Sequence, residues 1–199
     1  MTSRLVVNSV RHTGASADAI TLDSSGNVTF PGNATCSGTP SGFGGITMAD
    51  QWRITSEFQV TTSGAFITSN WERNDSTGYG KIGTGMSESS GVFSFPTTGI
   101  YLIRIVINWY ASGGGVNYNR VGVYTTTDNS SYSERAFTWS GVESSNQYNN
   151  MMAEIMFDVT NVSNRKVKFQ MLASNTRPRV RGETNYNASY ATFIRLGDS

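Results

Sequence analysis

The chain of 199 residues contains a single cysteine, Cys36, and a single histidine, His12. One cysteine excludes an intrachain disulfide, so the fold does not depend on an oxidising compartment. Cysteine–histidine metal spacing is absent, and a nucleophile–histidine arrangement would have to use His12, which lies outside the strand-rich part of the chain. Cys36 stands in a glycine-rich stretch without an evident activating neighbour. The sequence therefore predicts a protein that is not an enzyme and needs no cofactor.

Charge is also scarce, since charged residues make up 15% of the chain, against roughly 25% in ordinary globular proteins. The net charge of +1 provides no overall field that favours nucleic acid or an anionic membrane. No apolar run approaches the roughly 18 residues of a membrane-spanning helix, and no signal peptide is evident. We therefore expect a chain made in a cytoplasm, with no nucleic-acid partner and no membrane insertion.

Helical periodicity is missing as well, because no stretch longer than about two turns shows it. Strand signals recur instead, with turn signals between them. The predicted strands span residues 54–60, 65–71, 92–95, 100–110, 116–125, 135–139, 151–159, 167–173 and 190–196. This number and spacing of strands is typical of a sandwich or jelly roll. We assign residues 47–199 to an all-β jelly-roll domain.

Residues 1–46 have a different composition. A short apolar strand is expected at residues 5–7, and a hairpin is expected at residues 19–30 around Asp23-Ser-Ser-Gly26. A stretch rich in Gly, Pro, Ser and Thr follows at residues 31–45 and resembles a linker. These strands are too short and too few to bury a core alone. We expect an anchoring or trimerising arm, with a floppy arm as the alternative; its candidate contact residues are Leu5, Val7, Ile20, Leu22, Val28 and Phe30.

The predicted strand at residues 100–110 is apolar on both faces. A strand of this kind is usually buried on both faces, whereas the outer face of a two-layer sandwich should be wet. We expect this outer face to pack on a neighbouring subunit, with a covering loop of the same chain as the alternative. The candidate interface residues are Ile100, Leu102, Val106 and Tyr110.

A compact motif precedes this strand, in which Gly91, Phe93, Pro96, Gly99 and Tyr101 occur in the spacing Gly-x-Phe-x-x-Pro-x-x-Gly-x-Tyr. The motif resembles that of the complement-type globular head, the jelly roll shared with tumour necrosis factor. Residues 189–196 resemble the closing strand of that family. The resemblance covers residues 50–196 and implies a trimer that binds ligands rather than catalyses.

Some complement-type heads also bind Ca²⁺ through loop oxygens. Asp75, Asp128 and Glu183 lie in predicted loops, but their spacing forms no recognised ligand loop. The sequence therefore leaves open whether the protein binds Ca²⁺, and no ligands are assigned.

The N-terminal region carries two further runs, Asn8-Ser-Val-Arg-His-Thr-Gly14 and Ala19-Ile-Thr-Leu-Asp-Ser-Ser-Gly-Asn-Val-Thr29. Both resemble a repeated element that precedes complement-like domains in marine bacteriophage structural proteins. This resemblance implies a virion surface protein, a homotrimeric short fibre or spike knob that binds the host surface, and other virion proteins as partners of the arm. A capsid decoration or head-fibre protein at threefold positions is the alternative, and a free carbohydrate-binding module is a more distant one.

Basic residues gather between positions 165 and 181, with six Lys or Arg and no Asp or Glu. In an extended segment Arg177, Arg179 and Arg181 share one face. Such a face suits an anionic glycan, a lipopolysaccharide phosphate or an acidic capsid surface. The alternative is a solvated loop that protects a sheet edge from aggregation.

Overall fold

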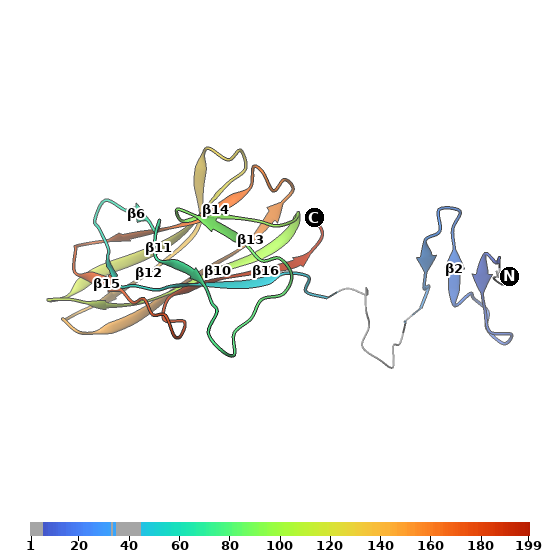
Figure 1. Ribbon diagram of the computed structural model, residues 1–199, viewed down its shortest axis with the longest axis horizontal. Coiled ribbons are helices and arrows are strands. Elements are labelled where there is room, and N and C mark those ends of the chain that lie inside the picture. The colour runs from blue at the N-terminus through green and yellow to red at the C-terminus, as the bar shows by residue number, and fades with distance from the viewer. Residues whose placement is uncertain (1–5, 33, 35–44) are drawn as a thin grey trace. The chain divides into compact units, whose positions relative to one another are not determined.

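A computed structural model describes residues 6–32, 34 and 45–199 of the chain (Figure 1). Its contacts divide the chain into two units, residues 1–45 and residues 46–199. Every regular element in the described ranges is a β-strand. The described residues contain no helix long and apolar enough to cross a membrane.

The N-terminal unit holds a three-stranded antiparallel sheet of β1 (Ser9–Val10), β2 (Ile20–Leu22) and β3 (Val28–Thr29). The expected hairpin is confirmed, because β2 pairs with β3 and Gly26 takes a φ of 83° in the turn. Asp23 closes this turn by accepting hydrogen bonds from the backbone N–H groups of Ser25 and Asn27. The prediction of a strand at residues 5–7 is wrong for residues 6 and 7, because the first strand begins at Ser9. Leu5 lies outside the described residues.

The C-terminal unit, which we call the head, consists of two sheets. Sheet I contains β4 (Ala49–Ile54), β5 (Phe58–Gln59), β7 (Trp71–Arg73), β10 (Gly99–Ala111), β13 (Tyr148–Val159), β15 (Pro178–Val180) and β16 (Tyr190–Gly197). Sheet II contains β6 (Ala65–Phe66), β8 (Ser87–Ser89), β9 (Val92–Ser94), β11 (Val116–Thr126), β12 (Tyr132–Val142) and β14 (Lys166–Ala173). The chain crosses repeatedly between the sheets, and the predicted all-β sandwich is confirmed.

Strand β10 lies between β13 and β16 in sheet I and is the longest strand of the head. It pairs with β13 from Gly99 to Tyr110 along one edge, and along the other edge it pairs first with β16 and then with β15. Its inward side chains are completely buried: Tyr101, Ile103, Ile105, Ile107 and Trp109. Burial of a large apolar side chain stabilises a fold by about 1.5–3 kcal/mol, so this one strand contributes a large share of the core.

The glycine and proline motif forms the corner between β9 in sheet II and β10 in sheet I. Gly91 has a φ of 79°, and a Cβ there would lie 2.1 Å from the carbonyl oxygen of Ile67. Gly99 has a φ of 138°, and a Cβ there would lie 2.4 Å from the carbonyl oxygen of Gly197. Both positions therefore require glycine, because other residues rarely adopt such backbone angles. Tyr101 anchors the corner by donating its hydroxyl to the carbonyl of Thr97 over 2.9 Å.

An aromatic cluster joins the two sheets around Phe93, which is fully buried on β9. Its ring centroid lies between 5.0 and 5.8 Å from the rings of Trp52, Trp71, Phe169 and Phe193. Aromatic pairs at these separations stabilise a core beyond the area that they bury. The motif residue Phe93 is thus part of the core and lies away from the surface of the head.

Two predicted strands are wrong in extent. Residues 54–60 were expected to form one strand. Instead, Ile54 is the last residue of β4, a bend follows, and only Phe58 and Gln59 of this segment form the next strand, β5. The strand expected at residues 65–71 is two strands, β6 in sheet II and β7 in sheet I. Asn70, with a φ of 65°, turns the chain between them. A left-handed asparagine is compatible with a local turn, and the pattern of residue types in the sequence did not reveal it.

Two segments outside the predicted strands also take part in the sheets, because Tyr132 begins β12 and residues 178–180 form β15. The remaining turn is organised by Asp128. Its carboxylate accepts hydrogen bonds from the backbone N–H groups of Ser130 and Ser131 over 2.9 and 2.8 Å and from the Thr126 hydroxyl over 2.7 Å. These hydrogen bonds to the ionised form hold the pKa of Asp128 well below its usual range.

We expect Asp128→Asn to lower the melting temperature of the head at neutral pH. A carboxyl group whose pKa is lower in the folded state stabilises the fold above its unfolded pKa of about 4, and this contribution is lost as the pH falls towards the folded value. The difference in melting temperature between the wild type and Asp128→Asn should therefore be constant from pH 7 to 5 and shrink below pH 4. Circular dichroism against temperature measures it, with Glu143→Gln as a control for loss of one exposed charge. A difference as large at pH 3 as at pH 7 would contradict the assignment.

Candidate functional site

The outer face of sheet I, which points away from the core, carries all four predicted interface residues. Burial alternates without interruption along β10, so each outward side chain is half-buried and each inward one is buried. Ile100, Leu102, Val106 and Tyr110 all belong to the outward set. The period of two that a strand imposes therefore brings these residues onto one surface.

The neighbouring strands extend this surface with further apolar side chains. Leu102 lies opposite Met156 of β13 on one side and Ile194 of β16 on the other. Val106 lies opposite Met152 and Tyr190 in the same way. Met156 is 72% exposed and Met152 is 54% exposed. We call these two rows of residues the apolar stripe: Leu102, Val106, Met152, Met156, Tyr190 and Ile194.

A single ion pair separates the two rows of the apolar stripe. Arg104 and Glu154 lie opposite each other on β10 and β13, and the Arg104 Nε donates to Glu154 Oε2 over 2.6 Å. Both side chains stay partly exposed. The pair leaves the centre of this surface without net charge.

The other half of the outer face of sheet I is covered by the chain itself. Arg53 of β4 points outward, yet it is only 2% exposed. Its guanidinium donates to Glu72 over 2.8 Å, to Asn74 over 3.0 Å and to Ser76 over 2.7 Å, and it pairs with Asp75 over 2.8 Å. An arginine with this many charge-assisted hydrogen bonds holds the segment after β7 over the sheet.

The cover continues through amide side chains. Asn74 donates to Asn187 over 2.5 Å, Asn187 donates to Gln51 over 3.1 Å, and Gln51 donates to Thr192 over 3.0 Å. The segment before β16 is thereby joined to β4. This cover lies over β4 and β7, whereas the covering loop considered as an alternative concerned the outer face of β10, where the apolar stripe keeps its exposed methionines.

The three predicted arginines surround β15, at one end of sheet I. Pro178 and Val180 are buried, so the alternation directs Arg179 to the outer face, opposite Tyr110 in the register. Arg177 donates to the carbonyl of Gly115 over 3.0 Å, and Arg179 donates to the carbonyl of Thr176 over 3.0 Å. Arg181 instead pairs with a carboxylate, that of Glu183, at 3.0 Å. The charge of Arg181 is therefore partly neutralised within the chain, whereas Arg177 and Arg179 bind neutral carbonyls.

An open hollow of about 380 Å³ lies beside Arg181 on this end of sheet I. Its lining combines a cation, two exposed tyrosines and two amides: Arg181, Tyr148, Tyr186, Asn108 and Asn187, together with Ala188. The Tyr148 and Tyr110 rings lie 5.3 Å apart, and Arg181 lies 5.8 Å from the Tyr148 ring. The hollow thus combines aromatic and amide groups with one arginine, whose charge Glu183 partly neutralises.

The basic residues between positions 165 and 181 do not form one patch. Arg165 donates to Thr160, and Lys166 donates to the carbonyl of Val162, at the turn between β13 and β14. Lys168 lies on sheet II, where its Nζ is 3.7 Å from the Phe66 ring centroid and 3.8 Å from that of Tyr132. Burial lowers the pKa of Lys168. The sequence cluster is divided because β14 belongs to sheet II and β15 to sheet I.

The carboxylates considered for Ca²⁺ each bind a donor of the same chain. Asp75 pairs with Arg53, Glu183 pairs with Arg181, and Asp128 accepts backbone N–H groups of its own turn. Within the described ranges, no three His, Cys, Asp or Glu side chains are grouped in a way that could hold a metal ion. These carboxylates have the partners expected of structural groups.

In the N-terminal unit most of the predicted anchor positions are exposed. Val7 and Leu22 are each 36% exposed, and Val28 is 52% exposed. Ile20 is half-buried, and Phe30 is largely exposed with interactions of its own. Leu5 and Cys36 lie outside the described residues. The described anchor side chains thus present apolar surface that the small sheet does not bury.

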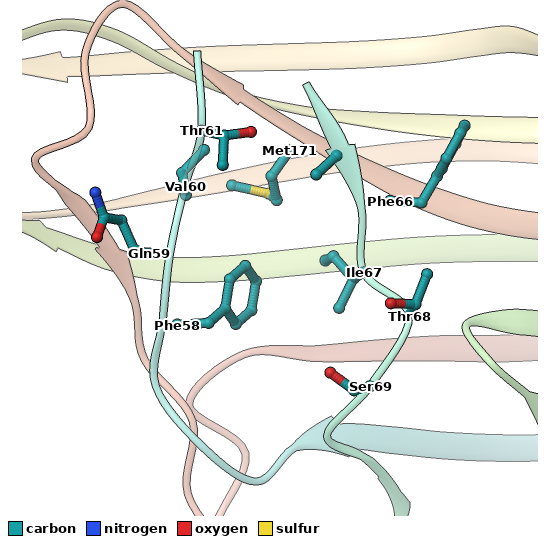
Figure 2. Close-up of a pocket in the computed structure, with 10 residues that line it drawn as sticks. Phe58, Gln59, Val60, Thr61, Phe66, Ile67, Thr68, Ser69 and Met171 are labelled. Carbon is teal, nitrogen blue, oxygen red and sulfur yellow. The ribbon is translucent and has the colours of Figure 1, made fainter. Parts of the chain in front are cut away.

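A second hollow, of about 130 Å³, opens between β5 and β6 at the edge where the two sheets part. Figure 2 shows Phe58, Ile67 and Met171 reaching into the space between the two short segments. Gln59, Thr61, Thr68 and Ser69 contribute polar groups, but no ionisable side chain lines the hollow. It therefore offers no acid, base or ion-binding group and matches an apolar gap between strand ends.

The outer face of sheet II carries an aromatic pair that the sequence analysis did not single out. Phe137 and Trp139 of β12 are 50% and 63% exposed, and their ring centroids lie 5.4 Å apart. Arg120 of β11 lies over the Phe137 ring at 4.3 Å. The i, i+2 spacing of the two aromatic residues was the available signal, although it could not reveal that the rings face solvent.

No protein-family model and no curated protein sequence matches the chain. Solved structures do match the head. Murine APRIL at pH 5.0 is similar with a TM-score of 0.55 and 11% identity over 75% of this chain and 98% of that chain. The Eiger TNF of S. frugiperda is similar with a TM-score of 0.57 and 12% identity over 77% of this chain and 95% of that chain. At these identities the likeness shows the fold: the chain contains an all-β, two-sheet jelly roll of the tumour-necrosis-factor type.

Proposed function

We propose that the protein is a homotrimeric binding head and that the outer face of sheet I forms the contact between subunits. The observation that carries this proposal is the apolar stripe, in which Met152 and Met156 are exposed beside Leu102 and Val106. Contiguous apolar surface on a soluble domain marks an interaction site. Methionine side chains adapt their shape to a partner surface, which suits a contact between copies of one chain.

The charges on this face are compatible with burial in an assembly. A buried charge without a partner destabilises an interface strongly. Arg104 and Glu154 already pair within each subunit, so closing the interface leaves neither charge unpaired. Ile100, at the start of β10, would extend the contact beyond the apolar stripe, and Tyr110, at the end of β10, would lie at the margin of the contact beside Arg179.

We further propose that the head is mounted on a bacteriophage particle through residues 1–46, which places the protein on the virion surface after its synthesis in the host cytoplasm. The support is the resemblance of residues 8–14 and 19–29 to an element of phage structural proteins, together with the exposed apolar side chains of Val7, Leu22 and Val28. A sheet of three short strands cannot bury a core alone, so a virion protein that covers these side chains would stabilise it.

Within this proposal, the head of a short fibre or spike binds the host surface and has no catalytic role. Capsid decoration, or a head fibre at threefold positions, is the second candidate, because a short arm is compatible with direct attachment to a capsid. A free carbohydrate-binding module is a third, and the exposed apolar positions of the arm count against it. The mounting of the head through its arm separates the first two candidates from the third.

The basic end of sheet I is our proposed contact for an anionic partner, such as a charged host glycan or an acidic capsid surface. Arg177, Arg179 and Arg181 lie around β15, and the first two donate to backbone carbonyls rather than to carboxylates. Guanidinium groups bind carboxylates and phosphates with paired hydrogen bonds. A trimer would present three copies of this end, so weak single contacts would add up through avidity.

Met156→Asp should convert the trimer into a monomer without unfolding the head. The side chain is exposed in the single chain, so the cost to the monomer should stay within about 0.5 kcal/mol, whereas three new charges would meet apolar surface in the assembly. Light scattering on a sizing column should give one chain mass, 21.6 kDa, in place of three times that mass. Phe137→Asp, on the other sheet, is the matched control and should leave the mass unchanged. A wild-type protein with the mass of one chain would contradict the proposal directly.

A chain that begins at Ile46 should keep the fold and the oligomeric state but lose attachment to particles. The truncated chain retains Met48, which is buried and whose carbonyl accepts the backbone N–H of Arg195 over 2.9 Å. Cosedimentation with phage particles made without this protein measures attachment, and a melting curve checks the fold. If the truncated head decorated such particles as well as the full chain does, the arm would not be the anchor.

Replacement of both Arg177 and Arg179 by serine should weaken the anionic contact. Each exposed ionic contact contributes about 0–1 kcal/mol, and three linked heads should multiply the loss to roughly 100-fold. Binding to host cells and to particles lacking the protein is measured at low and physiological salt, because the interaction is screened over about 8–10 Å. Arg165→Ser with Lys166→Ser removes the same charge at another turn and serves as control. If the Arg177/Arg179 variant bound as well as the Arg165/Lys166 variant, the proposed anionic contact would be wrong, and the two arginines would serve only solubility.

A further inference from the structure

We infer that the outer face of sheet II binds a neutral sugar ring on Trp139 and Phe137. This inference names the ligand class of the head, and so it rests on the proposed binding role, although it does not depend on the trimer or on the particle. The two side chains are 63% and 50% exposed and lie on β12. No function described above uses them.

The geometry of the two rings suits a pyranose. Trp139 and Phe137 are two residues apart on one strand, so both rings rise from the same face. Their centroids lie 5.4 Å apart and their planes meet at 47°, which makes an angled apolar surface rather than a flat one. A pyranose presents C–H groups on its faces and hydroxyl groups around its rim, so its face can pack on an aromatic ring while the rim meets polar groups.

Polar groups of the required kind lie beside the rings. Arg120 lies 4.3 Å from the Phe137 ring centroid and pairs with Glu134. The side chains of both are largely buried, at 14% and 26% exposed, so little conformational freedom remains to be lost when a ligand binds. Their planar guanidinium and carboxylate groups can donate to and accept from neighbouring hydroxyl groups.

The same pair argues for a neutral sugar over an acidic one. Arg120 is neutralised by Glu134, and Lys168, the nearby cation of β14, is held between the rings of Phe66 and Tyr132. A carboxylate or sulfate that reached Arg120 would therefore meet a compensated cation rather than a free positive charge. This distinguishes the aromatic pair from the arginines around β15.

A glycine lies on the neighbouring strand beside the aromatic pair. Gly122 of β11 lies opposite Phe137 in the register. A Cβ at Gly122 would lie 2.5 Å from Glu134 Oε1 and 3.0 Å from Tyr124 Cε2. Glycine in a strand often marks a place where other groups approach the backbone closely, and here it lets the carboxylate of Glu134 and the Tyr124 ring lie low on the sheet.

The aromatic pair also differs from the apolar stripe in a way that favours a ligand over another copy of the chain. The exposed apolar side chains of the stripe are flexible methionines, which adapt to a protein partner. Those of the aromatic pair are rigid rings, which lose little conformational entropy when a ligand packs on them. The two faces lie on opposite sheets of the sandwich, so a subunit contact through sheet I would leave the pair accessible.

The test is titration of the full chain with neutral oligosaccharides of glucose, galactose and mannose, and with a uronic-acid oligosaccharide of equal length. Tryptophan fluorescence is a direct readout, because Trp139 is exposed whereas Trp52, Trp71 and Trp109 pack in or against the core. We expect at least one neutral oligosaccharide to bind with a change in emission, and the uronic-acid probe to bind no tighter. Trp139→Ala should abolish the emission change and weaken binding, measured by calorimetry, about tenfold or more.

Tyr79→Ala, which removes an exposed aromatic outside both sheets, is the control and should bind as the wild type does. Phe137→Ala should weaken binding without removing the Trp139 signal. Absence of binding to every neutral probe, tighter binding of the uronic-acid probe, or binding unchanged in Trp139→Ala would overturn the inference. A changed assembly mass in Trp139→Ala without sugar binding would assign the pair to a contact between copies. The mass of the wild type in the same samples tests the proposed trimer separately.

Discussion

The head depends on the packing of one side of β10. Five large side chains from Tyr101 to Trp109 are completely buried there, and the strand is hydrogen-bonded along both edges. Because side chains alternate strictly along a strand, burial of this set directs Leu102, Arg104 and Val106 outward. A shift by one residue would exchange the two sets and place Arg104 in the core. The same constraint that builds the core therefore also determines the chemistry of the outer face of sheet I.

On the outer faces of the sandwich, charged side chains are paired in three places. Over β4 and β7, the Arg53 guanidinium donates hydrogen bonds to Asn74 and Asp75 and so holds the segment after β7 over the sheet. Over β10 and β13 the apolar stripe stays open, with Arg104 and Glu154 paired at its centre. On sheet II, Arg120 supports an exposed aromatic pair. Charges are neutralised locally in all three places, which agrees with the low net charge of the chain. Beside β15, by contrast, Arg177 and Arg179 bind backbone carbonyls instead of carboxylates, so their charges are not neutralised within the chain.

Much of the fold could be predicted because local patterns and tertiary packing agree. The hairpin around Asp23, the corner at Gly91 and Gly99, and the alternation in β13 all follow from residue types at fixed spacing. The failures have a common cause. Residues 65–71 look like one strand, yet Asn70 turns the chain from sheet II to sheet I. Apolar patterning reports that a segment is buried but not which sheet it joins, and a single residue with positive φ leaves little trace in a polar sequence.

The sequence by itself determined which side chains share a face, because the period of a strand is a local property; it also limited the chemistry, with one histidine and one cysteine. Only the tertiary structure decided which outward faces are covered. It separated Lys168 from Arg179 by placing β14 and β15 in different sheets, and it brought Arg120 over Phe137 and Arg53 to Asp75. These outcomes depend on pairing between segments far apart in the chain. Local patterns carry no record of that pairing, since strand neighbours are chosen by the packing of the whole sandwich.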